Sequence, residues 1–196
     1  MAFDMTRKHR KKIFCIEGNW NPRLSDRASV RPVLELLEVN SDIGYIYKDC
    51  STEEELYYLL ERWQQKAYAD YKILYLAFHG EPGRILIDTK HKVSLDQLGD
   101  NLCCRTHRRI IYFGACSVLR VDKRIIKRFM RAAGVRAVCG YTTDVDWIPS
   151  TALDLIAMNE LQRFSTTRQG MEAAEKSIRT NTHRLAGRLG FRMVYA

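Results

Sequence analysis

Length, composition and charge exclude several classes of protein. The chain has 196 residues, 46% of them hydrophobic and 28% charged, which is typical of a globular protein with a substantial core. No apolar run approaches the ~18 residues that cross a bilayer, and no signal-peptide core follows the basic N-terminus, so we expect a cytoplasmic protein. The formal charge of +9 is dispersed apart from residues 7–12, which favours a solvated basic surface over a nucleic-acid or membrane partner.

Apolar segments along the chain alternate between the spacing of strands and that of helices. Buried strands are predicted at 13–16, 43–47, 73–78, 109–113 and 135–141, with a small pair at 84–88 and 92–93 and a closing strand at 191–195. Helices are predicted at 29–39, 51–67, 95–103, 122–133, 149–163 and 168–188. This alternation predicts an α/β fold with a mostly parallel sheet and helices on both faces.

Capping residues mark several of the expected helix ends. Ser51 and Glu54 fit a capping box, Ser94 and Asp122 are expected to start the next two helices, and Gly134 to end the second of these. No linker, low-complexity stretch or internal repeat interrupts the chain. We therefore expect a basic tail at residues 1–12 and one domain at residues 13–196.

Two chemically reactive side chains follow buried strands. His79 comes directly after the strand at 73–78, and Cys116 follows the strand at 109–113. If these strands are neighbours, about 4.8 Å apart, both side chains emerge at one edge of the sheet, where ligands of α/β proteins bind. An imidazole beside a thiol allows nucleophilic catalysis, and the N–H groups of Gly80 and Cys116 are candidate oxyanion donors.

The surrounding residues extend this pattern. An apolar strand ending in Phe78-His79-Gly80 is followed, 37 positions after the histidine, by a second strand ending in Gly114-Ala115-Cys116-Ser117. The pattern resembles caspase-like cysteine peptidases, with most likeness to the bacterial branch that includes CHAT domains. Histidine precedes cysteine as in caspases, although the spacing is shorter than the about 50 residues seen there. Residues 133–141 also resemble the strand that follows the CHAT cysteine, and the likeness covers residues 13–196.

The resemblance implies a fold and roles for the matched positions. It implies a three-layer caspase-like sandwich, with Cys116 as nucleophile, His79 as general acid and base, and the Gly80 and Cys116 N–H groups as oxyanion donors. The chain would then be a cysteine endopeptidase acting on proteins or peptides. The Gln-Ala-Cys-x-Gly motif of animal caspases is absent, so cleavage after aspartate is not implied.

Charge suggests a different specificity. Caspase-like enzymes build their first specificity pocket after the first strand and after the strand that follows the cysteine. Here those segments contain Glu17, and Asp144, Asp146 and Trp147. Acidic side chains bind Lys or Arg by charge-assisted hydrogen bonds, so the hypothesis is cleavage after basic residues. The alternative is that Glu17 or Asp146 pairs with a surface arginine or caps the following helix.

Other readings of the chain remain open. Cys103, Cys104, His107 and Cys116 raise the alternative of a zinc site, but no C-x-x-C pair exists, and we expect no metal or other cofactor. A catalytically silent caspase-like scaffold or ligand-binding module is the main rival to a protease. The six cysteines are expected to be reduced.

A protease in the cytoplasm must be controlled, and no sensor segment is recognisable in the sequence. The resemblance implies a signal-activated effector of the bacterial anti-phage or cell-death type. Its activator would be a partner protein, a second copy of the chain, or a small nucleotide bound at the basic surface.

Overall fold

The predicted alternation of strands and helices is confirmed. The computed structural model describes residues 11–23, 25–88, 90–102 and 108–196. Residues 1–10 of the predicted basic tail lie outside the described residues, as do Cys103, Cys104 and His107 of the alternative zinc site.

Six of the described strands form one sheet, in the order β2-β1-β3-β7-β8-β9. Its strands are β1 (Ile13–Glu17), β2 (Tyr45–Asp49), β3 (Ile73–Ala77), β7 (Ile110–Gly114), β8 (Ala137–Tyr141) and β9 (Phe191–Tyr195). The first five are parallel, and β9 runs antiparallel to β8. The chain therefore lays β2 on one side of β1 and the later strands on the other, which makes a topological switch between β1 and β3.

A small antiparallel sheet follows β3. It contains β4 (His79–Glu81), β5 (Arg84–Leu86) and β6 (Lys92–Ser94). The predicted pair at 84–88 and 92–93 is confirmed over a shorter length. The prediction of a sharp turn beginning at His79 is wrong, because His79 starts a strand and the turn follows at residues 82–83, where Gly83 has φ +77°.

The helices match the predicted segments, with shifted ends. They are α1 (Arg31–Ser41), α2 (Glu53–Gln64), α3 (Leu95–Leu102), α4 (Lys123–Ala133), α5 (Trp147–Leu161), α6 (Arg168–Thr182) and α7 (Arg184–Arg188). A single-turn 3-10 helix, η1 (Lys66–Tyr68), follows α2.

Two of the sequence predictions about helices are wrong in detail. The predicted helix at 168–188 is interrupted at His183, whose φ of 45° is incompatible with a continuous helix. The N-cap of α2 is Thr52 and not Ser51: its hydroxyl accepts from the Glu55 N–H, and Glu55 in turn accepts from the Ser51 N–H. The caps at Ser94, Asp122 and Gly134 are confirmed.

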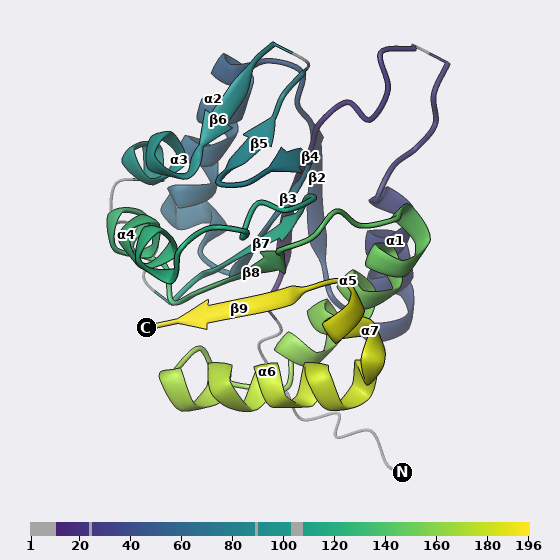
Figure 1. The fold of residues 1–196 in the computed structure, drawn as a ribbon, viewed down its shortest axis with the longest axis vertical. Helices are drawn as coiled ribbons and strands as arrows, with labels where there is room; N and C mark the ends of the chain where they lie inside the picture. Colours follow the sequence, from purple (N-terminus) through teal and green to yellow (C-terminus); the bar gives the residue numbers. More distant parts are fainter. Residues whose placement is uncertain (1–10, 24, 89, 103–107) are drawn as a thin grey trace.

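Alternating side chains of the sheet enter two separate cores. Phe14, Ile16, Leu74 and Leu76 pack with α2, α3 and α4 on one face. Their neighbours Ile13, Cys15, Ile73 and Tyr75 pack with α1, α5 and α6 on the other. Figure 1 shows these two helical layers on either side of the sheet. The predicted sandwich of helices, sheet and helices is confirmed, and the strands are continuous apolar runs because both of their faces are buried.

A buried carboxylate lies in the second core. Asp154 on α5 is 3% exposed and accepts hydrogen bonds from the hydroxyls of Tyr75, Tyr112 and Tyr141, on β3, β7 and β8. Burial raises the pKa of Asp154 to about 6, although these hydroxyls favour its charged form. The network joins α5 to the middle of the sheet.

This pKa predicts a specific pH dependence of stability. A carboxyl whose pKa is higher in the folded chain than its ordinary 3.8 stabilises the fold most at low pH, and that contribution falls as pH rises through about 6. Asp154→Asn cannot ionise, so from pH 4 to 7 its unfolding free energy should gain about 2 kcal/mol relative to wild type. Urea unfolding at several pH values measures this. A wild-type-to-variant difference that does not change with pH would contradict the assignment.

Candidate active site

The carboxyl ends of the parallel strands bring the candidate residues to one edge of the sheet. Glu17 on β1, Ala77 on β3 and Gly114 on β7 are aligned in one row by the strand register. His79 and Cys116 each follow two residues beyond that row. The strands that precede them, β3 and β7, are direct parallel neighbours. This is the arrangement for which the sequence predicted that both side chains emerge at one edge.

The backbones around these two residues touch. A Cβ added at Gly80 would lie 2.4 Å from the carbonyl oxygen of Cys116 and 2.6 Å from Cγ2 of Val118. The Gly83 N–H donates to the Val118 carbonyl at 3.0 Å, which holds the β4–β5 hairpin against the turn after β7. Position 80 therefore has no room for a side chain, and His79 is held beside the Cys116 turn.

The His79 ring is exposed and oriented by the loop after β1. Its Nε2 lies 2.8 Å from the backbone carbonyl oxygen of Trp20. Because a carbonyl only accepts, Nε2 carries the proton, and Nδ1 of the neutral ring has a free lone pair. The Trp20 ring contacts His79 edge-on, with centroids 5.2 Å apart, and Trp147 at 4.7 Å. The loop residue Trp20 thus joins two of the predicted site segments.

Cys116 is half-buried in a sharp turn. The Val145 N–H points at its Sγ from 3.4 Å, and Sγ lies 3.7 Å from the Val145 carbonyl oxygen. The next residue, Ser117, has φ +54°, which is uncommon for a residue with a side chain. Its N–H donates to the Thr143 carbonyl at 2.9 Å and its hydroxyl to Asp144 at 2.6 Å. The segment after β8 therefore braces the cysteine turn.

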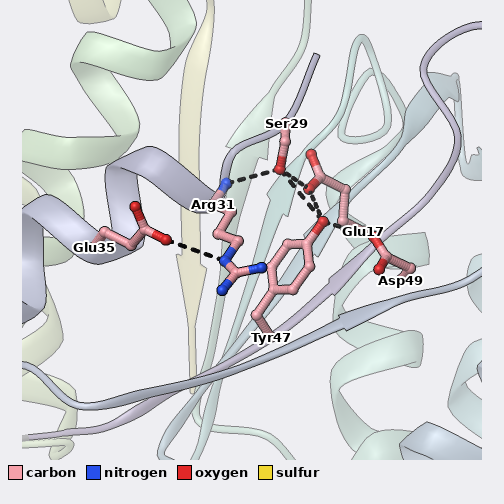
Figure 2. Close-up of polar contacts among 6 residues, drawn as sticks. All are labelled: Glu17, Ser29, Arg31, Glu35, Tyr47 and Asp49. Carbon is pink, nitrogen blue, oxygen red and sulfur yellow. Dashed lines mark hydrogen bonds and ion pairs between the residues drawn. The ribbon is translucent and has the colours of Figure 1, made fainter. Parts of the chain in front are cut away.

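Glu17, predicted to bind substrate, is buried and 2% exposed. One carboxylate oxygen accepts from the Trp20 indole and the Val30 N–H, the other from the hydroxyls of Ser29 and Tyr47. Figure 2 shows Ser29 and Tyr47 directed at this carboxylate. Glu17 thus ties together both ends of the loop at residues 18–30.

Tyr47 lies between two carboxylates. Its hydroxyl is 2.6 Å from Glu17 Oε2 and 2.7 Å from Asp49 Oδ1 (Figure 2), yet it has one proton to donate. Burial raises the pKa of Tyr47, and these carboxylates raise it further. A pocket of about 350 Å³ is lined by these three residues together with Trp20 and Asp26 among others. The signal that sequence reasoning missed is Tyr47 and Asp49 at alternate positions of an edge strand.

The other predicted specificity residues lie after β8. Asp144 is exposed and accepts from Ser117, so it supports the cysteine turn. Asp146 is exposed at the N-cap position of α5, but its side chain makes no capping hydrogen bond. Trp147 is half-buried against Trp20. The structure therefore brings the segments of all the predicted site residues to one edge, while Glu17 and Asp144 also bind groups of their own chain.

Other kinds of site can be compared with the described part of the chain. Within it, no group of three or more His, Cys, Asp or Glu side chains is arranged to hold a metal ion. The described cysteines Cys15, Cys50, Cys116 and Cys139 are free thiols. Among the described helices, none has the length and apolar character needed to cross a membrane.

Comparisons with known proteins give a family and a fold. A model described as "Family of unknown function (DUF6642)" matches residues 10–195. Among solved structures, the crystal structure of Caspase-1 from Spodoptera frugiperda is similar, with a TM-score of 0.59 and 13% identity, over 98% of this chain and 90% of that chain. No curated protein matches. At this identity the likeness shows the fold alone: the predicted caspase-like fold is confirmed, and the narrower CHAT-type likeness stays a prediction.

The contacts of Glu17 predict that it holds its loop in place. Glu17→Ala leaves the buried Val30 N–H and the Trp20 indole N–H without their acceptor, so unfolding should become easier by about 3 kcal/mol or more. Urea unfolding measures this loss, and amide exchange at Val30 should accelerate with it.

Glu35→Ala is the matched control for this prediction. Glu35 pairs with Arg31 at 3.1 Å, but both side chains are more than half exposed, so its loss should change stability by less than about 1 kcal/mol. Equal losses in the two variants would show that the Glu17 hydrogen bonds contribute no more than a surface pair.

Proposed function

This chain belongs to the family of unknown function DUF6642, and we propose that it is a cysteine endopeptidase with His79 and Cys116 as its catalytic dyad. The observation that carries the proposal is the contact between Gly80 and the Cys116 carbonyl at the carboxyl edge of a caspase-like sheet. That contact supports a histidine and a cysteine acting on one substrate bond.

The reaction follows from the chemistry of the two side chains. The Cys116 thiol first gives its proton to His79 Nδ1. The resulting thiolate attacks the peptide carbonyl carbon and forms an S–C bond, while the carbonyl π-electrons move to oxygen. The tetrahedral intermediate collapses, the C–N bond breaks, and the leaving amine takes a proton from His79 Nδ1. His79 Nδ1 then removes a proton from water, which attacks the thioester and releases the carboxylic acid and the thiolate. The Trp20 carbonyl would hold the ring in orientation throughout.

Two backbone N–H groups are the proposed donors to the oxyanion. Gly80 pairs with Ile85 one step away from the Glu81–Arg84 pair that closes the two-residue turn. In antiparallel pairing alternate residues are not hydrogen-bonded to the partner strand, so the Gly80 N–H is directed away from β5. The Cys116 N–H is the second donor. Together they would act as two donors on the developing negative charge.

Basic side chains are the proposed specificity. The pocket after β1 is lined by the carboxylates of Glu17, Asp26 and Asp49 together with Arg23 and Arg27, and Asp146 lies exposed after β8. Trp20 and Trp147, packed edge to face, offer aromatic surface to a guanidinium. Following the resemblance, we also propose that the protein is a cytoplasmic effector that a signal activates. Free thiols are expected in the reducing environment of the cytoplasm.

Removal of either dyad residue is predicted to abolish cleavage. Cys116→Ala and His79→Ala should each lower kcat/KM for a cleaved peptide by more than about 1,000-fold while thermal unfolding is unchanged. Cys50→Ser and His91→Ala are matched controls, since Cys50 is a buried thiol that contacts Thr52 and His91 an exposed ring paired with Asp88. Full activity of Cys116→Ala would show that Cys116 is not the nucleophile, and no cleavage by the wild-type chain would support the silent scaffold instead.

Specificity is tested with a peptide library read by mass spectrometry. Cleavage is expected after Lys or Arg, and Asp146→Asn should weaken kcat/KM for the Arg peptide several-fold by removing one charge-assisted contact. The same variant should leave cleavage after citrulline, the neutral isostere of arginine, unchanged. Preferred cleavage after Asp would overturn the acidic-pocket proposal while leaving the protease intact.

A further inference from the structure

A second pocket lies at the opposite edge of the sheet from His79 and Cys116. It has a volume of about 630 Å³, within the about 300–1,000 Å³ range of small-molecule sites. Its lining comes from the residues before β7 and β8, the exposed side of α4, the start of α6 and the end of β9. Figure 1 shows β9 between α4 and α6. One strand length of the sheet, about 16 Å, separates this pocket from the carboxyl edge.

The lining of this pocket is strongly basic. Its cationic side chains are Arg108, Lys127, Arg131, Arg136 and Arg168. Among the described lining residues there is no Asp or Glu side chain. Glu172 and Glu175 line a separate pocket, which shares only Tyr195 with this one. The positive charge is therefore concentrated by side chains that approach from separate elements of the fold.

Two of these cations lie on one face of α4. Lys127 and Arg131 are four residues apart on α4, where like charges face each other and repel. The sequence of α4 contains no acidic residue to separate them. Arg136 adds a third cation from the loop that follows the same helix. A bound anion would be attracted by cations that come from α4 and from the loop after it.

Arg136 also has an unsatisfied donor at this site. Its Nε is buried and has no hydrogen-bond partner among the described residues, while its Nη1 donates to the backbone oxygen of Ala196 at 2.5 Å. Buried guanidinium N–H groups without an acceptor are rare in folded proteins. An oxygen of a bound anion is the kind of acceptor that would satisfy it.

The remaining lining residues restrict the class of ligand that fits the pocket. Met130, Val135 and Tyr195 provide an apolar and aromatic surface beside the cations. Several cations suit a group with several phosphate charges, and the ring and the aliphatic side chains suit a flat heterocycle. We propose that this pocket, formed by Arg108, Lys127, Arg136, Arg168 and Tyr195, binds a nucleoside polyphosphate.

Binding is tested on the full chain by isothermal titration calorimetry and thermal unfolding. The probes are ATP in EDTA, inorganic tripolyphosphate and adenosine, at low salt. ATP should bind and raise the unfolding temperature, tripolyphosphate should bind more weakly because it lacks the base, and adenosine should not bind measurably. Phosphate charge and base would then both contribute to recognition.

Two variants locate the binding site. Lys127→Gln with Arg168→Gln removes two exposed cations of the lining and should weaken ATP binding by at least about tenfold without changing the fold. Arg124→Gln, on the same helix but outside the lining, is the control and should change ATP binding less than about twofold.

Three results would overturn the proposal. The first is no binding of ATP or tripolyphosphate at millimolar concentration. The second is equal weakening by the double variant and by Arg124→Gln, which would mean diffuse attraction to a basic surface. The third is tight binding of a 20-nucleotide RNA without binding of ATP, which would make this face a nucleic-acid surface. None of these readouts depends on peptidase activity, so they are independent of the proposed dyad.

Discussion

The contact between Gly80 and the carbonyl of Cys116 is the constraint on which the candidate site depends. Parallel pairing of β3 and β7 brings two strand ends together, but it leaves the loops after them free to diverge. The missing side chain at position 80 lets the β4 hairpin lie directly on the cysteine turn. The hydrogen bond from Gly83 to Val118 fixes that approach. His79 and Cys116 are therefore neighbours through backbone packing.

A second chain of contacts orients the histidine. The buried Glu17 carboxylate binds the Trp20 indole, and the Trp20 carbonyl accepts from His79 Nε2. Glu17 is thus connected to the candidate catalytic ring through one residue, and its hydrogen bonds to Val30 and Tyr47 anchor the same loop. On the other side, Thr143 and Asp144 hold the strained Ser117 that follows Cys116. Glu17 and Asp144, which the sequence suggested as substrate ligands, therefore also hold the loops around the candidate site in place.

The sequence predicted the architecture well because the strands are continuous apolar runs and the helices have clear periods. It also placed His79 and Cys116 correctly at adjacent strand ends, since both follow buried strands. The strand at 79–81 and the break at His183 could not be read from the pattern. The strand at 79–81 depends on a hairpin that packs against Val118. The break at His183 depends on its positive φ, and histidine is a residue type that also occurs within helices. The contacts of Glu17 were also hidden, because Val30 and Tyr47 reach it through tertiary folding.

The reactivity of Cys116 tests the central claim most directly. Folded protein is treated with a peptidyl chloromethyl ketone carrying Arg next to the reactive group, and with iodoacetamide, and the modified residue is located by peptide mapping. The account predicts that the Arg reagent alkylates Cys116 and that His79→Ala, still folded, abolishes this labelling. If Cys116 resists both the Arg reagent and iodoacetamide, it is an inaccessible core thiol, and the proposed dyad is wrong.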